Sequence, residues 1–287
     1  TVEEKPTGEI SAGAGVGTSG GSVMFGIKEN NFLGRGVAFG TNITLDAESL
    51  KGVISLNNPN YKGTNRSLNL SAQNVSTDRL TDYGYKSNKT GITIGSGFEF
   101  YDDLYLNRGL SVSSEKLDTS SKASANIKSQ EGTYFDTFFN YTLDYDKRNQ
   151  KYQTTDGYRS RFSQKIPLIN KSNTLTNTYD YKTYSEWFNE NITSLGFYAV
   201  ATNSLNGKNV KLSDRIFLSP NKLRGFESGK VGPKDGTDFI GGNYVMAVNL
   251  ATTLPQVLPN LQNIDFSLFL DAANVWGIDY SSSLSDD

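Results

Sequence analysis

The chain has 287 residues, a length that suits two ordinary domains or one large all-β barrel. Cysteine and histidine are absent, which excludes disulfides and thiolate zinc sites and removes the commonest general base and metal ligand. The 28 basic and 30 acidic residues give a net charge of −2, too balanced for a field that attracts nucleic acid. We therefore expect a protein that is not an enzyme, with no cofactor, no metal and no nucleic-acid partner.

Alternating polarity recurs along the chain between turn signals rich in Asn, Asp and Gly, and it predicts about 13 strands and no helix. The predicted strands cover residues 8–17, 21–30, 35–46, 49–57, 65–76, 90–101, 104–115, 131–143, 156–166, 174–184, 190–202, 242–253 and 263–273. One connection, residues 203–241, is far longer than the others, and connections of that length are usually functional or disordered.

The last predicted strand shows most clearly what the alternation separates. One face carries Ile264, Phe266, Leu268 and Leu270, and the other carries Asp265, Ser267, Phe269 and Asp271. The mean hydropathy is −0.48, and no run of about 18 apolar residues could form a transmembrane helix. A transmembrane β-barrel has this low average, because residues that face lipid alternate with residues that face the lumen. A soluble β-sandwich remains the alternative that composition alone allows.

Two glycine-rich stretches resemble nucleotide-binding loops without meeting their requirements. In "GFESGKVG", Gly225 and Gly229 enclose three residues rather than four, and Lys230 is followed by Val231 instead of Ser or Thr. The other, "GAGVGTSGG", does not open a helix after a buried strand. Glycine in a strand costs roughly 0.5 to 1 kcal/mol relative to alanine, so Gly8, Gly13, Gly15 and Gly17 predict a loosely held first strand.

The long connection contains an arginine that has a candidate partner. Asp271 lies on the polar face of its strand, and a long loop that folds into a lumen could bring Arg224 to it. A guanidinium presents a rigid fork of donors to a carboxylate, so a desolvated pair would hold the loop. The alternative is an exposed arginine that contributes almost nothing, and the sequence leaves the two possibilities open.

Several motifs, in order, resemble the BamA family of outer-membrane β-barrel assembly proteins. The family motif V/I-R-G-F/Y on the sixth outer loop matches Leu223, Arg224, Gly225 and Phe226, with leucine at the first position. "IGGN" follows it, as at the start of the family's twelfth strand. Further family segments are resembled by residues 8–40, by "YDKRNQKYQTTDGYRSRFSQKIP" and by "FLDAANVWG", so the resemblance covers essentially the whole chain.

The resemblance implies a transmembrane antiparallel up-and-down barrel in the bacterial outer membrane, with about 13 of 16 expected strands present. Residues 1–287 would then be a truncated barrel domain that lacks the periplasmic POTRA domains and the last three strands. Arg224 would enter the lumen with the loop and contact the acid of the thirteenth strand, Asp271. The acid that the family places on the twelfth strand falls at Ala251, so one expected partner is missing.

The function that the resemblance implies is the folding and insertion of other outer-membrane proteins. A weak seam between the first and last strands would accept a client strand, and Gly8, Gly13, Gly15 and Gly17 fit a seam that opens. The implied partners are unfolded outer-membrane proteins, assembly-complex lipoproteins and outer-membrane lipids. A two-partner secretion transporter, which exports an unfolded polypeptide, is the alternative from the same superfamily, and a diffusion porin would satisfy the alternation but not the motif-bearing loop.

Overall fold

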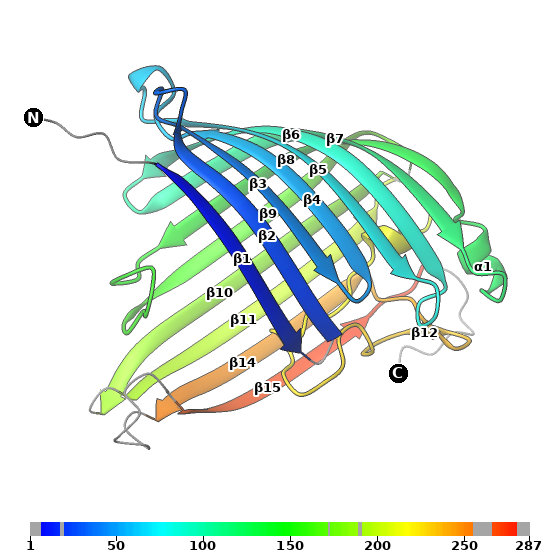
Figure 1. Cartoon of the computed structure of the whole chain (residues 1–287). Helices are drawn as coiled ribbons and strands as arrows, with labels where there is room; N and C mark the ends of the chain where they lie inside the picture. The colour runs from blue at the N-terminus through cyan, green and yellow to red at the C-terminus, as the bar shows by residue number, and fades with distance from the viewer. Residues whose placement is uncertain (1–6, 18–19, 172, 189–190, 255–265, 280–287) are drawn as a thin grey trace, which may run out of the picture.

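The protein forms one antiparallel sheet of 13 strands, seen in a computed structural model that describes residues 7–17, 20–171, 173–188, 191–254 and 266–279. The sheet curves round an interior, with β1 and β15 as its two end strands (Figure 1). Its strands are β1 (Gly8–Gly17), β2 (Gly20–Phe32), β3 (Val37–Asp46), β4 (Ser49–Asn58), β5 (Ser67–Arg79), β6 (Tyr85–Tyr101), β7 (Leu104–Thr119), β8 (Gly132–Asp146), β9 (Gly157–Asn170), β10 (Thr174–Phe188), β11 (Asn191–Ser204), β14 (Tyr244–Leu254) and β15 (Phe266–Trp276).

Each strand pairs with the next strand of the sheet, which confirms the predicted all-β, up-and-down antiparallel fold. The predicted boundaries were too narrow where strands continue through polar sequence. β6 begins at Tyr85 rather than at residue 90, and β7 ends at Thr119 rather than at residue 115. These extra residues pair with one another, because the backbone ladder needs no apolar side chain. Residue 190 and residues 263–265, which were also predicted as strand, lie outside the described residues.

The structure contains short elements that the sequence pattern did not predict. They are η1 (Tyr61–Gly63), α1 (Ala125–Lys128), η2 (Leu212–Asp214) and a separate hairpin of β12 (Lys234–Asp235) and β13 (Asp238–Phe239). Segments of two to four residues are too short to show periodicity. Within the described ranges, no helix has the length and apolar character needed to cross a membrane.

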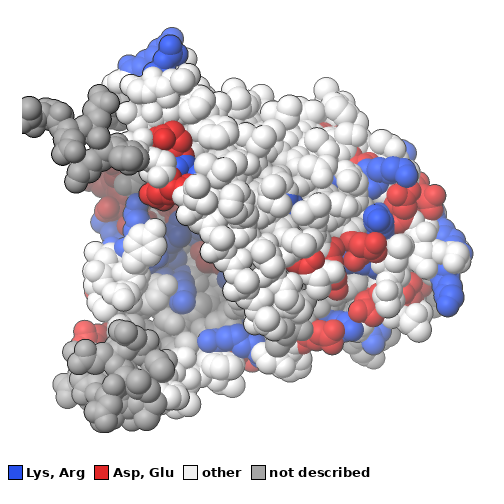
Figure 2. Space-filling model, viewed as in Figure 1, with Lys and Arg blue, Asp and Glu red and all other residues white. Residues whose placement is uncertain are grey.

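Alternate side chains of the strands separate into an apolar outer face and a polar inner face. On β15, Leu268 and Leu270 are 62% and 70% exposed, whereas the side chain of Asp271 is 3% exposed. Ile92 and Ile94 of β6 are also exposed. Figure 2 shows a broad uncharged surface over the strands nearest the viewer, with charged side chains gathered beside it. An exposed apolar band of this kind is the surface that a barrel presents to lipid.

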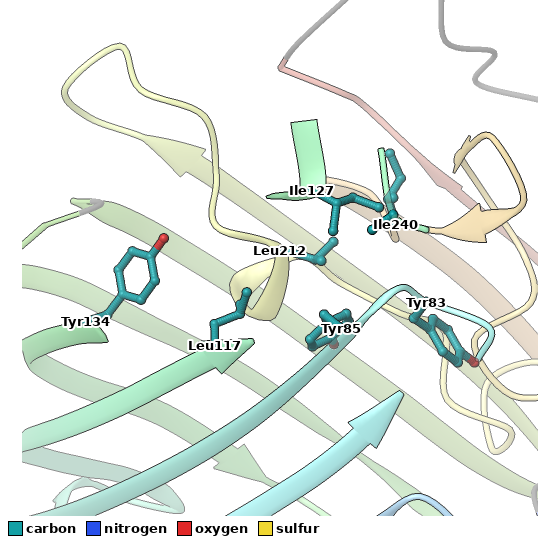
Figure 3. Packing of buried hydrophobic residues seen from close by; sticks show 8 residues of the cluster. Tyr83, Tyr85, Leu117, Ile127, Tyr134, Leu212 and Ile240 are labelled. Carbon is teal, nitrogen blue, oxygen red and sulfur yellow. The ribbon is translucent and has the colours of Figure 1, made fainter. Parts of the chain in front are cut away.

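The interior is occupied by the connection between β11 and β14, residues 205–243, which we call the inner loop. Two clusters of buried apolar side chains join it to the wall. In the first, Leu212 and Ile240 of the loop pack with Leu117 of β7 and Ile127 of α1 (Figure 3). In the second, Leu218 and Leu223 pack with Val200, Val245, Ala247 and Val275 of the last three strands of the sheet. The loop is therefore part of the folded core.

Candidate functional site

Two distant segments of the inner loop are joined to each other before the chain enters β14. Ile216 and Gly242 form an antiparallel bridge through two backbone hydrogen bonds of 2.8 and 3.0 Å. Glycine is required at position 242, because a Cβ there would lie 2.4 Å from the carbonyl oxygen of Trp276. This close approach explains the second glycine of the "IGGN" segment in physical terms.

The structure brings Arg224 and Asp271 together. Arg224 Nε donates to Asp271 Oδ2 at 2.7 Å, Arg224 Nη2 donates to Oδ1 at 2.6 Å, and the backbone N–H of Arg224 donates to Oδ2 at 3.0 Å. This is the two-pronged geometry in which a guanidinium binds a carboxylate most strongly. The hydrogen bonds to Asp271 raise the pKa of Arg224 above its ordinary value, against the opposing effect of burial. We call this pair the clasp.

Two neighbours complete the clasp, and the sequence pattern predicted neither of them as a partner. Asn249 lies opposite Asp271 in the β14–β15 register and donates Nδ2 to Asp271 Oδ1 at 2.9 Å and to the carbonyl of Lys222 at 2.9 Å. The guanidinium carbon of Arg224 lies over the ring of Phe269, 3.9 Å from the ring centroid. Ala251, where the family acid was expected, instead lies opposite Phe269. An amide from β14 therefore occupies the position beside the carboxylate, and only the β14–β15 register places it there.

The other residues of the motif place the arginine. Leu223 is buried in the second apolar cluster and fixes the chain immediately before Arg224. Gly225 has φ +84°, a left-handed conformation that a residue with a Cβ adopts only at a cost. Phe226 is 56% exposed. Burial of Leu223 and the ion pair of Arg224 therefore hold the motif in place. Gly225 turns the chain between Arg224 and the exposed Phe226.

The predicted seam residues all lie in β1, an end strand of the sheet. β1 pairs with β2 along its whole length, from Gly8 opposite Glu29 to Gly17 opposite Gly20. Among the described residues, no strand pairs with its other edge. Gly13 and Gly15 leave space, since an added Cβ would come no closer than 3.9 Å and 3.6 Å to the partner strand. The strand thus has hydrogen bonds on one side and little side-chain packing.

The sequence of residues 31–287 matches the Omp85 superfamily domain, which is nine-tenths of the chain by position. The chain belongs to the Omp85 superfamily. A SAM50-like protein of Schizosaccharomyces pombe is 45% identical over 56 residues, which cover 19% of this chain and 12% of that protein.

Two solved structures have the same fold as this Omp85 chain. BamA from Haemophilus ducreyi lacking POTRA domains 1–3 matches 96% of the chain with a TM-score of 0.85 at 24% identity. CdiB from Acinetobacter baumannii matches the same share with a TM-score of 0.58 at 13% identity. The chain spans 59% of the first protein and 49% of the second. The family and the fold together confirm the predicted β-barrel class and the bacterial outer-membrane localisation.

Proposed function

We propose that this chain is the barrel of an assembly factor that folds and inserts β-barrel proteins into the bacterial outer membrane. Family membership and the fold similarity to BamA support the proposal. The observation that carries it is the composition of β1: a glycine-rich strand in which Gly13 and Gly15 leave space against β2, so few side-chain contacts hold it. Assembly of this kind requires no catalytic residue, because the client is folded by strand pairing and not by covalent chemistry.

The proposed mechanism is addition of a client strand to the open edge of β1. An end strand presents unpaired N–H and C=O groups, and these accept an incoming strand whatever its side chains are. Main-chain hydrogen bonds supply the affinity, so many unfolded outer-membrane proteins can be clients. Few side-chain contacts hold β1, so it can separate from a client that has folded. Membrane lipids contact the apolar outer face, and assembly lipoproteins are the further partners that we propose.

The role that we propose for the clasp is to hold the inner loop against β14 and β15 while the edge of β1 exchanges partners. Arg224 reaches from the loop to Asp271 on β15. Asn249 adds a link to the adjacent strand. The clasp would then keep the inner loop attached to β14 and β15 during this exchange.

Secretion of an unfolded polypeptide through the lumen is the second candidate, and the fold similarity to CdiB favours it to a lesser degree. The TM-score to CdiB is 0.58, compared with 0.85 to BamA. The inner loop also makes many contacts inside the barrel, which a transport path would have to displace.

The two functions are separated by adding an unfolded β-barrel client to lipid vesicles that contain the full-length protein. Assembly predicts that the client becomes a heat-resistant folded band on an unboiled gel and stays in the bilayer, at a rate well above that in empty vesicles. Secretion predicts that the client appears unfolded on the far side of the membrane. The second result would contradict the proposed function.

A further inference from the structure

Residues 210–212, which we call the base of the inner loop, are more deeply buried than the motif arginine. Val210, Lys211 and Leu212 are 0%, 2% and 0% exposed. By contrast, the side chain of Arg224 is 34% exposed. A buried lysine is rare and requires compensating charge, so its surroundings identify what holds the base.

Carboxylates from two strands of the wall and from the loop itself surround Lys211. Its Nζ lies 2.8 Å from Glu115 Oε2 of β7, 2.9 Å from Asp136 Oδ2 of β8 and 3.5 Å from Asp214 Oδ2. The side chains of Glu115 and Asp136 are 2% and 0% exposed. The ammonium also lies 4.7 Å from the ring centroid of Tyr134. The carboxylates of Glu115 and Asp136 in the wall therefore bind Lys211 of the inner loop.

Lys165 of β9 extends the cluster. Its Nζ lies 3.8 Å from Asp214 Oδ1 and 3.7 Å from the ring centroid of Phe138. Burial alone would lower the pKa of Lys211, but the carboxylates of Asp214, Glu115 and Asp136 outweigh burial and raise it. Both ions of the pair formed by Lys211 and Asp214 are thus stabilised in their charged forms.

Packing surrounds the charges. The backbone N–H of Leu212 donates to Gln130 Oε1 at 2.7 Å. The side chain of Leu212 packs with Leu117 of β7 and Ile127 of α1 (Figure 3). The base therefore contacts β7, β8 and α1, and the backbone N–H of Val210 also donates to Asp279 Oδ2, just after β15, at 2.7 Å.

We propose that Lys211 is the principal positioning residue of the inner loop, fastening its base to β7 and β8, and that the clasp at Arg224 orients only the segment around the motif. The loop is then held to β7 and β8 through Lys211 and to β15 through Arg224, and the anchor at Lys211 is the stronger of the two. The consequence for client assembly rests on the function proposed above, whereas the anchoring itself does not.

The test uses thiol labelling in the full-length protein, because this chain has no cysteine of its own. Val210→Cys reports on the base and Leu223→Cys reports on the motif, since both positions are buried. Lys211→Met leaves the wall carboxylates without their cation, and such a loss raises the labelling rate of Val210→Cys by roughly 100-fold. Lys208→Met, at an exposed lysine of the same loop, is the matched control and leaves the rate unchanged.

A second variant separates anchoring from folding. Lys211→Met with Glu115→Gln and Asp136→Asn removes the lysine together with both wall charges, so no unpaired ion remains at the wall and the barrel keeps its heat-resistant band. In this background Val210→Cys is still labelled faster than in the parent, and Arg224→Ala speeds labelling at Leu223→Cys only.

Unchanged protection of Val210→Cys in either folded variant would overturn the proposal. So would failure of both variants to form the heat-resistant band, because the cluster would then be a requirement of the wall and not an anchor of the loop. Loss of client assembly is expected in the variants that release the base. If the base is released and client assembly continues, Lys211 is still the anchor of the loop, but this anchor is not needed for the proposed function.

Discussion

Replacing Arg224 with alanine should weaken the clasp without leaving Asp271 unpaired. The variant loses the two side-chain hydrogen bonds of 2.7 and 2.6 Å. In the variant, Asp271 still accepts hydrogen bonds from the backbone N–H of residue 224 and from Asn249 Nδ2. A fully desolvated ion pair that loses one partner costs roughly 3 to 5 kcal/mol. Because Arg224 is 34% exposed and Asp271 keeps two donors, the cost here should be about 2 kcal/mol.

The assay is the temperature at which the folded band of the full-length protein disappears from unboiled gels. A loss of about 2 kcal/mol lowers that midpoint by roughly 5 °C for a domain of this size. Arg224→Lys keeps the charge but not the planar fork, so its midpoint falls between those of the parent and the alanine variant. Lys208→Ala, on the same loop, controls for surface charge.

A double-mutant cycle tests whether the effect comes from the pair. Arg224→Ala should cost much less in an Asp271→Asn background than in the parent, because the partner charge is already gone. Equal costs in the two backgrounds would refute the reasoning, since the arginine would then act through some contact other than Asp271.

Three further predictions follow from the seam, the motif turn and the base of the loop. Gly13→Ala with Gly15→Ala has room for both methyl groups and should stabilise β1 by about 1 to 2 kcal/mol, slowing client assembly in the vesicle assay, whereas Gly52→Ala in β4 should leave the rate unchanged. Gly225→Ala meets no atom within 4 Å, so only the backbone strain at φ +84°, about 1 kcal/mol, should lower the heat midpoint. The ammonium groups of Lys211 in the loop and Lys165 in the wall outweigh burial and lower the pKa of Asp214. The Asp214 carboxylate therefore stabilises the fold above its unfolded pKa of about 3.9, and this stabilisation is lost as the pH falls below that pKa. The protection factors of amides at the loop base, which correct exchange for its intrinsic pH dependence, should therefore stay constant from pH 8 to 5 and fall only below about pH 4, and a fall near neutrality would contradict the assignment.

The strands could be predicted because the period-two alternation is local. Each of the 13 predicted ranges corresponds to one strand of the sheet, and the face that carries Leu268 and Leu270 is the exposed one. The pattern failed where side chains no longer alternate in polarity, as at the start of β6, because backbone pairing continues there without an apolar signal.

The clasp could be predicted in part, from a motif arginine and an acid on an inward face. Asn249 was missed because an amide on a strand gives no signal until the register places it beside Asp271. Lys211 was missed for a different reason. Its partners Glu115 and Asp136 come from two strands about 75 to 100 positions away, and a lysine in a polar loop is ordinarily solvated.

The central claim, that β1 receives the client strand, is tested most directly by disulfide trapping during assembly. Single cysteines placed along residues 8–17 of the full-length protein are paired with a cysteine in the terminal strand of an unfolded client, and Gly52→Cys in β4 and Ala251→Cys on the inner face of β14 serve as controls. Crosslinks to β1 should form early and disappear as the client becomes heat-resistant, with none at Gly52→Cys. Crosslinks confined to Ala251→Cys and other inner-face positions, with none to β1, would contradict it and indicate passage through the lumen.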